Sequence, residues 1–380
     1  MSCRRSTRRV QSQVYFPYNE QVREGITPMN ATITGWGKCV PQPVLTNADI
    51  ATVVDTSDEW ITSRSGIKER RISHVNNSDM AALAGRRALA AAGVDAEDID
   101  YIVVATCTSD RQIPSAACYV QAKIGALNAA ASDINAGCTG FIYGLSMAHG
   151  LLATGSARRV LVIGSERISS FLDLEERSTA VLFGDGAGAV VVEGTEGSDG
   201  IHSMLLGADG NGAEALTATG VGTEFIGTDA RMAIVMDGAE IFRNAVVRMV
   251  ESTVDVVERA GWELDEIDLV VPHQANIRII DAVRRRIGAS EEKVFTNIHK
   301  YGNTSAATIP IAIAEAVDEG RIKPGDRLVL VAFGSGMTWG ATAIEWGGRV
   351  HRLDTIDDEL PEPEMSALEI LVSKQKAVHG

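Results

Sequence analysis

The chain has 380 residues, of which 45% are hydrophobic, and its formal net charge is −15. This length can bury a large core in one large domain or two, whereas the negative charge argues against a nucleic-acid partner. No stretch approaches the roughly 18 uncharged apolar residues of a membrane span, so none is expected. The five cysteines lack C-x-x-C spacing and predict neither a disulfide framework nor a metal site, which is typical of a reducing, cytoplasmic setting.

The N-terminal segment 1–28 differs in composition from the rest of the chain. Four arginines lie near its start, followed by polar and aromatic residues without periodicity. It has no apolar region of the kind found in signal peptides, and Glu20 and Glu24 argue against a transit peptide. We therefore interpret residues 1–28 as a flexible extension and expect the folded unit to begin at Met29.

The middle of the chain contains an internal repeat. Residues 91–103, AAGVDAEDIDYIV, align without a gap with residues 259–271, RAGWELDEIDLVV. Each copy reads as a helix end, a glycine, an acidic turn and a strand, and a helical stretch ending in Ile-Gly-Ala follows each strand. Continuous apolar strands are expected when helices cover both faces of a sheet. We predict two similar α/β halves, 29–200 and 201–348, packed against each other.

One cysteine of the first half lies where a predicted strand meets a predicted helix. Small residues at 132–137 precede Cys138, and the apolar run 141–152 follows it. A thiol at a helix N-terminus faces unpaired backbone N–H groups and the positive end of the helix dipole, so we expect its thiolate to be favoured. An isolated cysteine is more often a buried structural residue. Cys138 becomes a candidate nucleophile only because other candidate catalytic residues are expected close to it in the fold.

The second half supplies two further candidates at strand ends. His273 follows the repeated strand that ends at Val271, and Asn303 follows a strand predicted at 294–298, which the repeat makes equivalent to the strand before Cys138. Taken alone, the histidine could be a structural core residue and the asparagine a turn residue. Three such side chains at strand ends, where the two halves meet, predict an active site.

The C-terminal extension, residues 349–380, begins with an acidic, proline-bearing stretch that is typical of a solvated linker. Residues 366–376 could form a short amphipathic helix.

Several segments of the chain, in this order and spacing, together resemble one known family. They are TSDEWITSRSGI at 56–67, Cys138 with its flanks, FGDGAG at 183–188, HQAN at 273–276, YGNTS at 301–305 and FGSGMTWG at 333–340. The chain is similar over about residues 30–347 to β-ketoacyl-acyl-carrier-protein synthase III, the initiating condensing enzyme of the thiolase superfamily. The resemblance implies a thiolase-like fold, in which two pseudo-symmetric α/β halves form a layered α-β-α-β-α sandwich.

The resemblance also implies a Cys-His-Asn site and its chemistry. Cys138 would take an acyl group from acyl-CoA as a thioester, and His273 and Asn303 would stabilise the enolate left when malonyl-acyl-carrier protein (malonyl-ACP) loses CO₂. Independently of the family, a carbanion equivalent beside a thioester needs neutral hydrogen-bond donors aimed at its oxygen. The backbone N–H groups of Cys138 and Ser335 would form the oxyanion hole, although the family usually has glycine at position 335. No cofactor or metal is expected, because acyl-CoA is a substrate.

Further positions carry binding roles by the same resemblance. Those expected to hold CoA or to line the pantetheine tunnel are Thr56, Trp60, Arg64, Arg177, Gly238, Phe242 and Asn276. Arg243 and Arg278 would meet the acidic carrier protein, as a local basic patch on an acidic chain. Ile113 would shape the acyl pocket across a homodimer interface, and an aliphatic residue at this often aromatic position would admit longer or branched acyl groups.

The sequence raises four alternatives to a priming ketosynthase. A relative of specialised metabolism, using an unusual acyl starter or malonyl-CoA, stays open, and so does a plain acyltransferase, although that activity would not need Asn303. A thiolase proper would use a second catalytic cysteine, and no cysteine follows Cys138. A non-catalytic scaffold with this fold should have lost Cys138 or His273, and both are present.

Overall fold

A computed structural model describes residues 13–15 and 30–379 of the chain. Two five-stranded sheets form its centre. The first sheet has the strand order β2 (Asn30–Cys39), β8 (Gly186–Thr195), β7 (Arg159–Glu166), β5 (Tyr101–Ala105) and β6 (Ala130–Ile134). The second has the order β1 (Gln13–Tyr15), β9 (Gly200–Ala208), β14 (Thr338–Glu345), β13 (Arg327–Gly334) and β12 (Leu269–Pro272).

The two sheets repeat each other, as the sequence predicts. Strands β5 and β12 come from the two aligned copies of the repeat, and each pairs in parallel with the next long strand, β7 or β13. That strand pairs antiparallel with β8 or β14. The central strands β7 and β13 are buried almost throughout, which agrees with their continuous apolar sequence.

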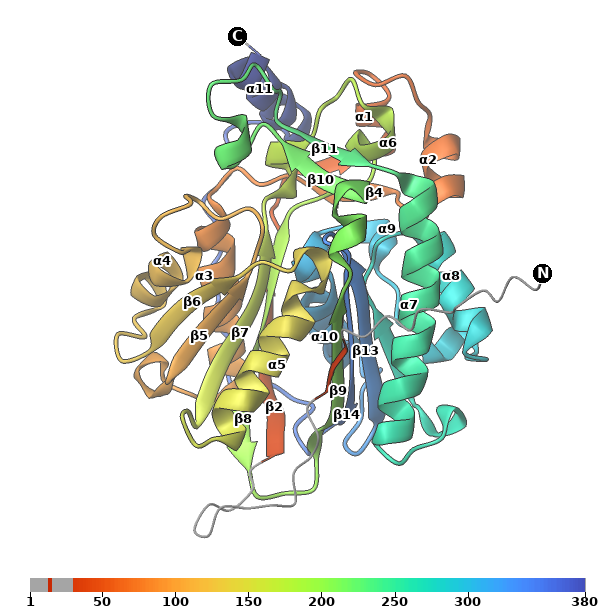
Figure 1. The fold of residues 1–380 in the computed structure, drawn as a ribbon. Helices are drawn as coiled ribbons and strands as arrows, with labels where there is room; N and C mark the ends of the chain where they lie inside the picture. Colours follow the sequence, from red (N-terminus) through yellow and green to blue (C-terminus); the bar gives the residue numbers. More distant parts are fainter. Residues whose placement is uncertain (1–12, 16–29, 380) are drawn as a thin grey trace, which may run out of the picture.

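Helices cover and separate the sheets in five layers (Figure 1). Helices α3 (Asn77–Ala92) and α4 (Ala116–Ile124) lie on the outer face of the first sheet, and α7 (Gly238–Arg259) and α8 (Ile277–Arg286) lie on that of the second. Helices α5 (Gly140–Ala153) and α10 (Thr308–Asp318) fill the space between the sheets. This is the layered α-β-α-β-α sandwich expected from the sequence.

Close packing between these layers depends on glycines of β2. A Cβ at Gly35 would lie 2.3 Å from the carbonyl oxygen of Ala88, and one at Gly37 would lie 2.3 Å from that of Ala84. Any side chain at either position would push α3 away from the sheet and open the core between them.

The remaining regular elements are short, and several of them gather at one end of the sandwich (Figure 1). They are β3 (Val44–Thr46), α1 (Asn47–Ile50), α2 (Asp58–Ser65), β4 (Glu69–Arg71), α6 (Arg177–Ala180), β10 (Leu216–Thr219), β11 (Ala233–Met236), α9 (Ile298–Tyr301) and α11 (Ala367–His379). Ile61, Val181 and Phe183 belong to the hydrophobic cluster that holds many of these pieces together.

The strand predicted at 294–298 is not present. Val294 makes only an isolated parallel bridge with Val270, and helix α9 begins at Ile298. The polar residue between them explains the difference. The backbone N–H of Asn297 donates to Gln274 at 3.0 Å and its side-chain amide donates to Glu315 at 2.9 Å, so this residue is held by side chains rather than by a strand ladder.

The N-terminal extension is not wholly without structure. Residues Gln13–Tyr15 form β1, which pairs antiparallel with β9 at the edge of the second sheet. The expectation of a flexible extension is therefore wrong for these three residues. The rest of 1–28, with Met29, lies outside the described residues.

The acidic stretch after Gly348 is mostly exposed, as a solvated linker would be, but it is anchored to the rest of the fold at several points. The Arg349 guanidinium donates to the carbonyl oxygens of Thr34 and Ala92. Further along, Arg87 forms an ion pair with Glu359 at 2.7 Å. These contacts tie the stretch to the first half, through a basic residue of the stretch at one point and an acidic one at another.

The predicted C-terminal helix is confirmed as α11. Its Ile370 and Leu371 are buried in the same cluster as Val181 and Phe183. Lys374 donates to the hydroxyl of Ser169 at 2.9 Å, and burial lowers the pKa of this lysine to about 8. The tail thus ends as an integral part of the core at that end of the sandwich.

In the described residues, no helix is both long and apolar enough to cross a membrane. The four cysteines of this part of the chain, Cys39, Cys107, Cys118 and Cys138, are free thiols.

Truncating Ile370 tests whether α11 belongs to the core. Ile370 is 3% exposed, so Ile370→Ala removes buried apolar volume and should lower the free energy of unfolding by about 2–4 kcal/mol in urea denaturation. Met365→Ala, at a residue that is 46% exposed, is the control and should change stability by less than about 0.5 kcal/mol. Equal stability of the two variants would contradict the packing of α11.

Candidate active site

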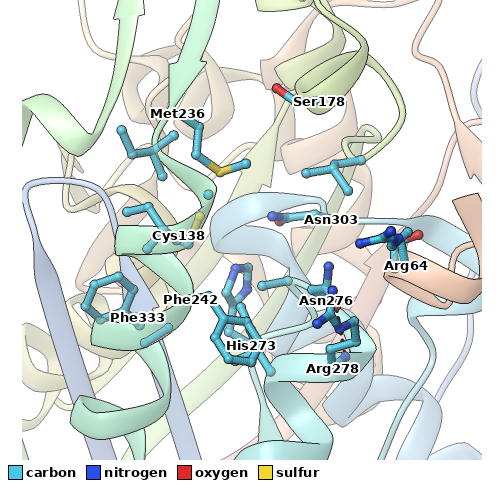
Figure 2. Close-up of a pocket in the computed structure, with 18 of the residues that line it drawn as sticks. Arg64, Cys138, Ser178, Met236, Phe242, His273, Asn276, Arg278, Asn303 and Phe333 are labelled. Atoms are coloured by element: carbon cyan, nitrogen blue, oxygen red, sulfur yellow. Dashed lines mark hydrogen bonds between the residues drawn. The ribbon is translucent and has the colours of Figure 1, made fainter. Parts of the chain in front are cut away.

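Cys138, His273 and Asn303 line one cavity of about 600 Å³. Cys138 lies in a 3₁₀ turn, Gly137–Thr139, between β6 and α5. His273 directly follows β12, and Asn303 follows the short helix α9. Figure 2 shows the three side chains pointing into the same space. The structure therefore brings together the three residues that the sequence singled out from two halves of the chain.

The backbone beside Cys138 is in direct contact with the loop after β13. A Cβ at Gly334 would lie 2.8 Å from the backbone nitrogen of Cys138, and one at Gly137 would lie 3.1 Å from that of Ser335. Gly137 also has a φ of +54°, a region that favours glycine. Glycine at both positions therefore lets the loop after β13 pack directly against the backbone around Cys138.

Burial dominates the acidity of Cys138. The side chain is 8% exposed, and desolvation raises the pKa of its thiol to about 11. A hydrogen bond with Ser305 acts in the opposite direction, and the nearby Glu166 raises the pKa further. The expectation of a favoured thiolate is therefore wrong for the free site, because the cost of burying the charge exceeds the benefit of the helix N-terminus.

Glu166, at the end of β7, is a buried carboxyl that sequence reasoning missed. It accepts hydrogen bonds from the backbone N–H of Cys107 at 3.2 Å and from the hydroxyl of Ser305 at 3.1 Å, and the hydroxyl of Thr108 also donates to it. Burial raises the pKa of Glu166. An acidic residue closing an otherwise apolar strand was the available signal in the sequence.

His273 is a buried imidazole that is neutral at physiological pH. It is 2% exposed, and burial lowers its pKa to about 3. Its Nδ1 lies 2.6 Å from the hydroxyl oxygen of Thr308. Its Nε2 has no hydrogen-bond partner among the described residues, and the ring faces the cavity (Figure 2).

Asn303 is oriented by its own loop. Its Oδ1 accepts the backbone N–H of Ser305 at 2.8 Å, so its amide NH₂ is the end left for a ligand. Ser305 adopts a φ of +51°, which is uncommon for a residue with a side chain. The turn Asn303–Thr304–Ser305 is thus bent so that the amide of Asn303 can point into the cavity.

Most of the residues expected to bind CoA, pantetheine or the carrier protein do line this cavity. They are Trp60, Arg64, Gly238, Phe242, Arg243, Asn276 and Arg278. Arg177 lies just outside the lining, with its guanidinium 4.8 Å from the centre of the Trp60 ring. Asn276 caps α8 by accepting the backbone N–H of Arg278, which places the latter at the cavity rim.

Besides Arg177, three expected site residues do not line the cavity. Thr56 lies shortly before α2, and its hydroxyl is buried without a hydrogen-bond partner. Ile113 is 85% exposed and lies outside the cavity within this chain. Ser335 is not among the lining residues, but its neighbour Gly334 is, and its backbone packs against Gly137 as described above.

The apolar wall of the cavity was not found from the sequence. It includes Val181, Leu182, Phe183, Leu216, Met236 and Ile241. Apolar residues of this kind occur throughout any core, so only the fold shows which of them face the site. Met236, labelled in Figure 2, lines the same cavity as Cys138.

Comparison with known proteins agrees with this geometry. The family model of 3-oxoacyl-[acyl-carrier-protein] synthase III matches residues 132–239, and the model of its C-terminal part matches residues 257–346. The β-ketoacyl-[acyl-carrier-protein] synthase III 2 of Vibrio cholerae is 50% identical over 349 residues, which cover 91% of this chain and 96% of that protein. The synthase III of Geobacillus kaustophilus is 49% identical over 84% of this chain and 100% of its own length.

Solved structures give the same result. The crystal structure of 3-oxoacyl-[acyl-carrier-protein] synthase III from Aquifex aeolicus is 47% identical in sequence, with a TM-score of 0.79 over 83% of this chain and 100% of that chain. The priming β-ketosynthase from the R1128 polyketide pathway is 33% identical, with a TM-score of 0.81 over 87% of this chain and 99% of its own. These likenesses confirm the fold class predicted from the sequence.

The raised pKa of Cys138 predicts how its alkylation depends on pH. Only the thiolate reacts with iodoacetamide, so the rate should rise about tenfold per pH unit from pH 7 to 9 without reaching a plateau. Peptide mass spectrometry would follow Cys138 separately from the other cysteines, and Cys138→Ala gives the background. A plateau below pH 8 would mean that the helix N-terminus, not burial, controls the thiol.

Proposed function

Because this chain belongs to the β-ketoacyl-acyl-carrier-protein synthase III family, we propose that it condenses an acyl group from acyl-CoA with malonyl-ACP. The products are β-ketoacyl-ACP, CoA and CO₂, and the reaction initiates fatty-acid synthesis. The observation that carries this proposal is the meeting of Cys138, His273 and Asn303 in one buried cavity.

In the first half-reaction, Cys138 is the nucleophile. Its sulfur attacks the thioester carbonyl of acyl-CoA, and the backbone N–H groups of Cys138 and Ser335 stabilise the resulting oxyanion. The C–S bond to CoA then breaks, the acyl group stays on Cys138, and the thiol proton leaves with CoA. A serine at position 335 supports this role as well as glycine would, because the donor is the backbone.

In the second half-reaction, the thioester oxygen of malonyl-ACP accepts hydrogen bonds from Nε2 of His273 and the amide of Asn303. Loss of CO₂ leaves an enolate, whose carbon attacks the acyl carbonyl and releases the sulfur of Cys138. Both donors are neutral, and burial lowers the pKa of His273 to about 3, so the imidazole holds no spare proton that the enolate could capture.

The substrate CoA supplies its own binding handles, and no cofactor is needed. Adenine would insert between the planar groups of Trp60 and Arg177, which contact each other in the free protein. Arg64 would bind the base or the phosphates, and Thr56 would support this end of the site. Pantetheine would run past Gly238, Phe242 and Asn276 toward Cys138.

The protein acts as a homodimer in this proposal. Strand β6 is an unpaired edge of the first sheet, and such edges are commonly covered by a partner. Ile113 and Leu127, which are 85% and 71% exposed, are large apolar side chains that flank helix α4 before this strand. Pairing through this edge would cover them and let Ile113 reach the partner's acyl pocket. A cytoplasmic location fits the unpaired thiols.

A second candidate is a ketosynthase that primes a specialised pathway. The 33% identity to the R1128 priming β-ketosynthase, together with an aliphatic residue at 113, favours keeping it. It differs from the first candidate in its starter group and in whether malonyl arrives on ACP or on CoA.

Intact-protein mass spectrometry with a panel of acyl-CoAs tests the proposal. We expect one acyl adduct per chain, absent in Cys138→Ala, that malonyl-ACP discharges as a β-ketoacyl product. The preferred acyl group identifies the starter, and longer or branched groups are expected from Ile113. Acylation confined to acetyl-CoA would refute that expectation.

The same experiment has outcomes that remove each candidate. No adduct with any acyl-CoA means that the priming role must be withdrawn. An adduct that malonyl-CoA discharges but malonyl-ACP does not would select the second candidate. Acyl transfer without loss of CO₂ would contradict the proposed role of His273 and Asn303, because no enolate would then need to be stabilised.

Arg278 tests docking of the carrier protein. Arg278→Ala should lower kcat/KM for malonyl-ACP about tenfold, because it removes a cation that faces an acidic partner, and the effect should shrink at high salt. Malonyl-pantetheine, which lacks the carrier protein, is the matched substrate and should lose much less. An equal loss with both substrates would place Arg278 in the tunnel rather than at the docking surface.

A further inference from the structure

The hydroxyl of Thr308 lies behind His273, on the side away from the cavity. Thr308 is the first residue of α10 and is 3% exposed. Its oxygen is 2.6 Å from Nδ1 of His273 and 3.0 Å from the carbonyl oxygen of Ser305. The hydroxyl thus has two neighbours that can accept a proton and only one proton to give.

Where that proton goes decides the tautomer of the imidazole. If the hydroxyl donates to the carbonyl of Ser305, Nδ1 of His273 must carry a hydrogen and donate to the hydroxyl, which leaves Nε2 without a proton. If the hydroxyl donates to Nδ1, the hydrogen of the neutral ring lies on Nε2. The two arrangements exclude each other.

Nothing else in the described residues makes this choice. Thr308 is the only hydrogen-bond partner of the His273 side chain in this part of the chain. The buried carboxyl of Glu166 bonds to the hydroxyl of Ser305 and not to the ring. The ring also has no charged partner, and burial keeps it neutral.

The proposed condensation requires a hydrogen on Nε2. That nitrogen faces the cavity, and stabilising an enolate oxygen needs a donor there, whereas a bare Nε2 would repel the oxygen. Resting on the proposed function, we propose that Thr308 is a positioning residue, whose hydroxyl donates to Nδ1 and holds His273 in the Nε2–H tautomer. In this arrangement the hydroxyl gives its proton to Nδ1 of His273, 2.6 Å away, and not to the carbonyl oxygen of Ser305, which is 3.0 Å away.

Ser305 links this arrangement to the other donor. Its backbone N–H orients Asn303, and its carbonyl oxygen faces the Thr308 hydroxyl. The turn thus orients the Asn303 amide directly. The carbonyl of Ser305 competes with Nδ1 of His273 for the proton of the Thr308 hydroxyl, so this residue lies beside both donors of the proposed enolate site.

The ¹⁵N spectrum of histidine-labelled protein tests the tautomer directly. The His273 signals are assigned by their loss in His273→Asn. In the unmodified protein and in Thr308→Ser, we expect an unprotonated Nδ1 and a protonated Nε2. In Thr308→Val, which keeps the shape but removes the hydroxyl, the Nδ1–H form should appear. A protonated Nδ1 in the unmodified protein would overturn the proposal.

Kinetics on the acyl-enzyme supply the second readout. Thr308→Val should slow discharge by saturating malonyl-ACP about 10- to 100-fold, somewhat less than loss of a whole oxyanion donor, with little change in KM. Acylation of Cys138 by acyl-CoA should persist, which shows that the variant is folded. Thr308→Ser should restore the discharge rate. Unchanged discharge in Thr308→Val, or no rescue by serine, counts against the proposal.

Thr253→Val is the matched control. Thr253 is 1% exposed in α7, and among the described residues its hydroxyl has no hydrogen-bond partner, so the same change there should alter neither the ¹⁵N spectrum nor the discharge rate. If Thr308→Val does not fold, the ¹⁵N spectra of the unmodified protein and of Thr308→Ser still test the proposal, because both should show the Nε2–H tautomer. The spectrum needs no turnover, so a failure to acylate Cys138 would remove the proposed function without touching the tautomer.

Discussion

Burial of Cys138 and His273, which with Asn303 form the trio of site residues, is the physical constraint on which the rest of the site depends. Burial moves the two titrating side chains of the trio in opposite directions, raising the pKa of the Cys138 thiol to about 11 and lowering that of His273 to about 3. At neutral pH both are uncharged, and Asn303 is always so. In the proposed mechanism the site therefore acts through oriented dipoles, which are stronger in a medium of low dielectric constant than in water. Because both side chains are neutral, neither adds the free-energy cost of an unpaired buried charge.

The fold produces this buried site by bringing the ends of two sheets into contact through glycine residues. Cys138 stands after the edge strand of one sheet and His273 after the edge strand of the other, and the backbones around Gly137 and Gly334 are in contact. A side chain at either glycine would separate the halves at the site itself. The duplicated architecture is thus more than a scaffold, because each half carries residues that the other half lacks.

The repeat and the short motifs were enough to predict the layered fold and the meeting of the catalytic trio, since both depend on local patterns that the sequence displays. The partners of these residues were not predictable in the same way. Glu166 and Thr308 act through contacts across long sequence separations, and apolar lining residues such as Met236 carry no chemical signature. The anchoring of the acidic stretch was not predictable for a related reason, because its partners, such as Arg87 and the carbonyl oxygen of Thr34, lie far away in the sequence.

The strain at Ser305 explains why this turn has the residues it has. A φ of +51° would suit glycine, yet the side chain is used, since its hydroxyl bonds to Glu166 and contacts Cys138. Its backbone N–H orients Asn303 and its carbonyl meets Thr308. Ser305 therefore contacts Cys138 and Asn303 directly, and it contacts Thr308, the hydrogen-bond partner of His273. A glycine would relieve the backbone but would lose the link between the buried carboxyl and the thiol, so the strained conformation persists because the surrounding contacts hold it there.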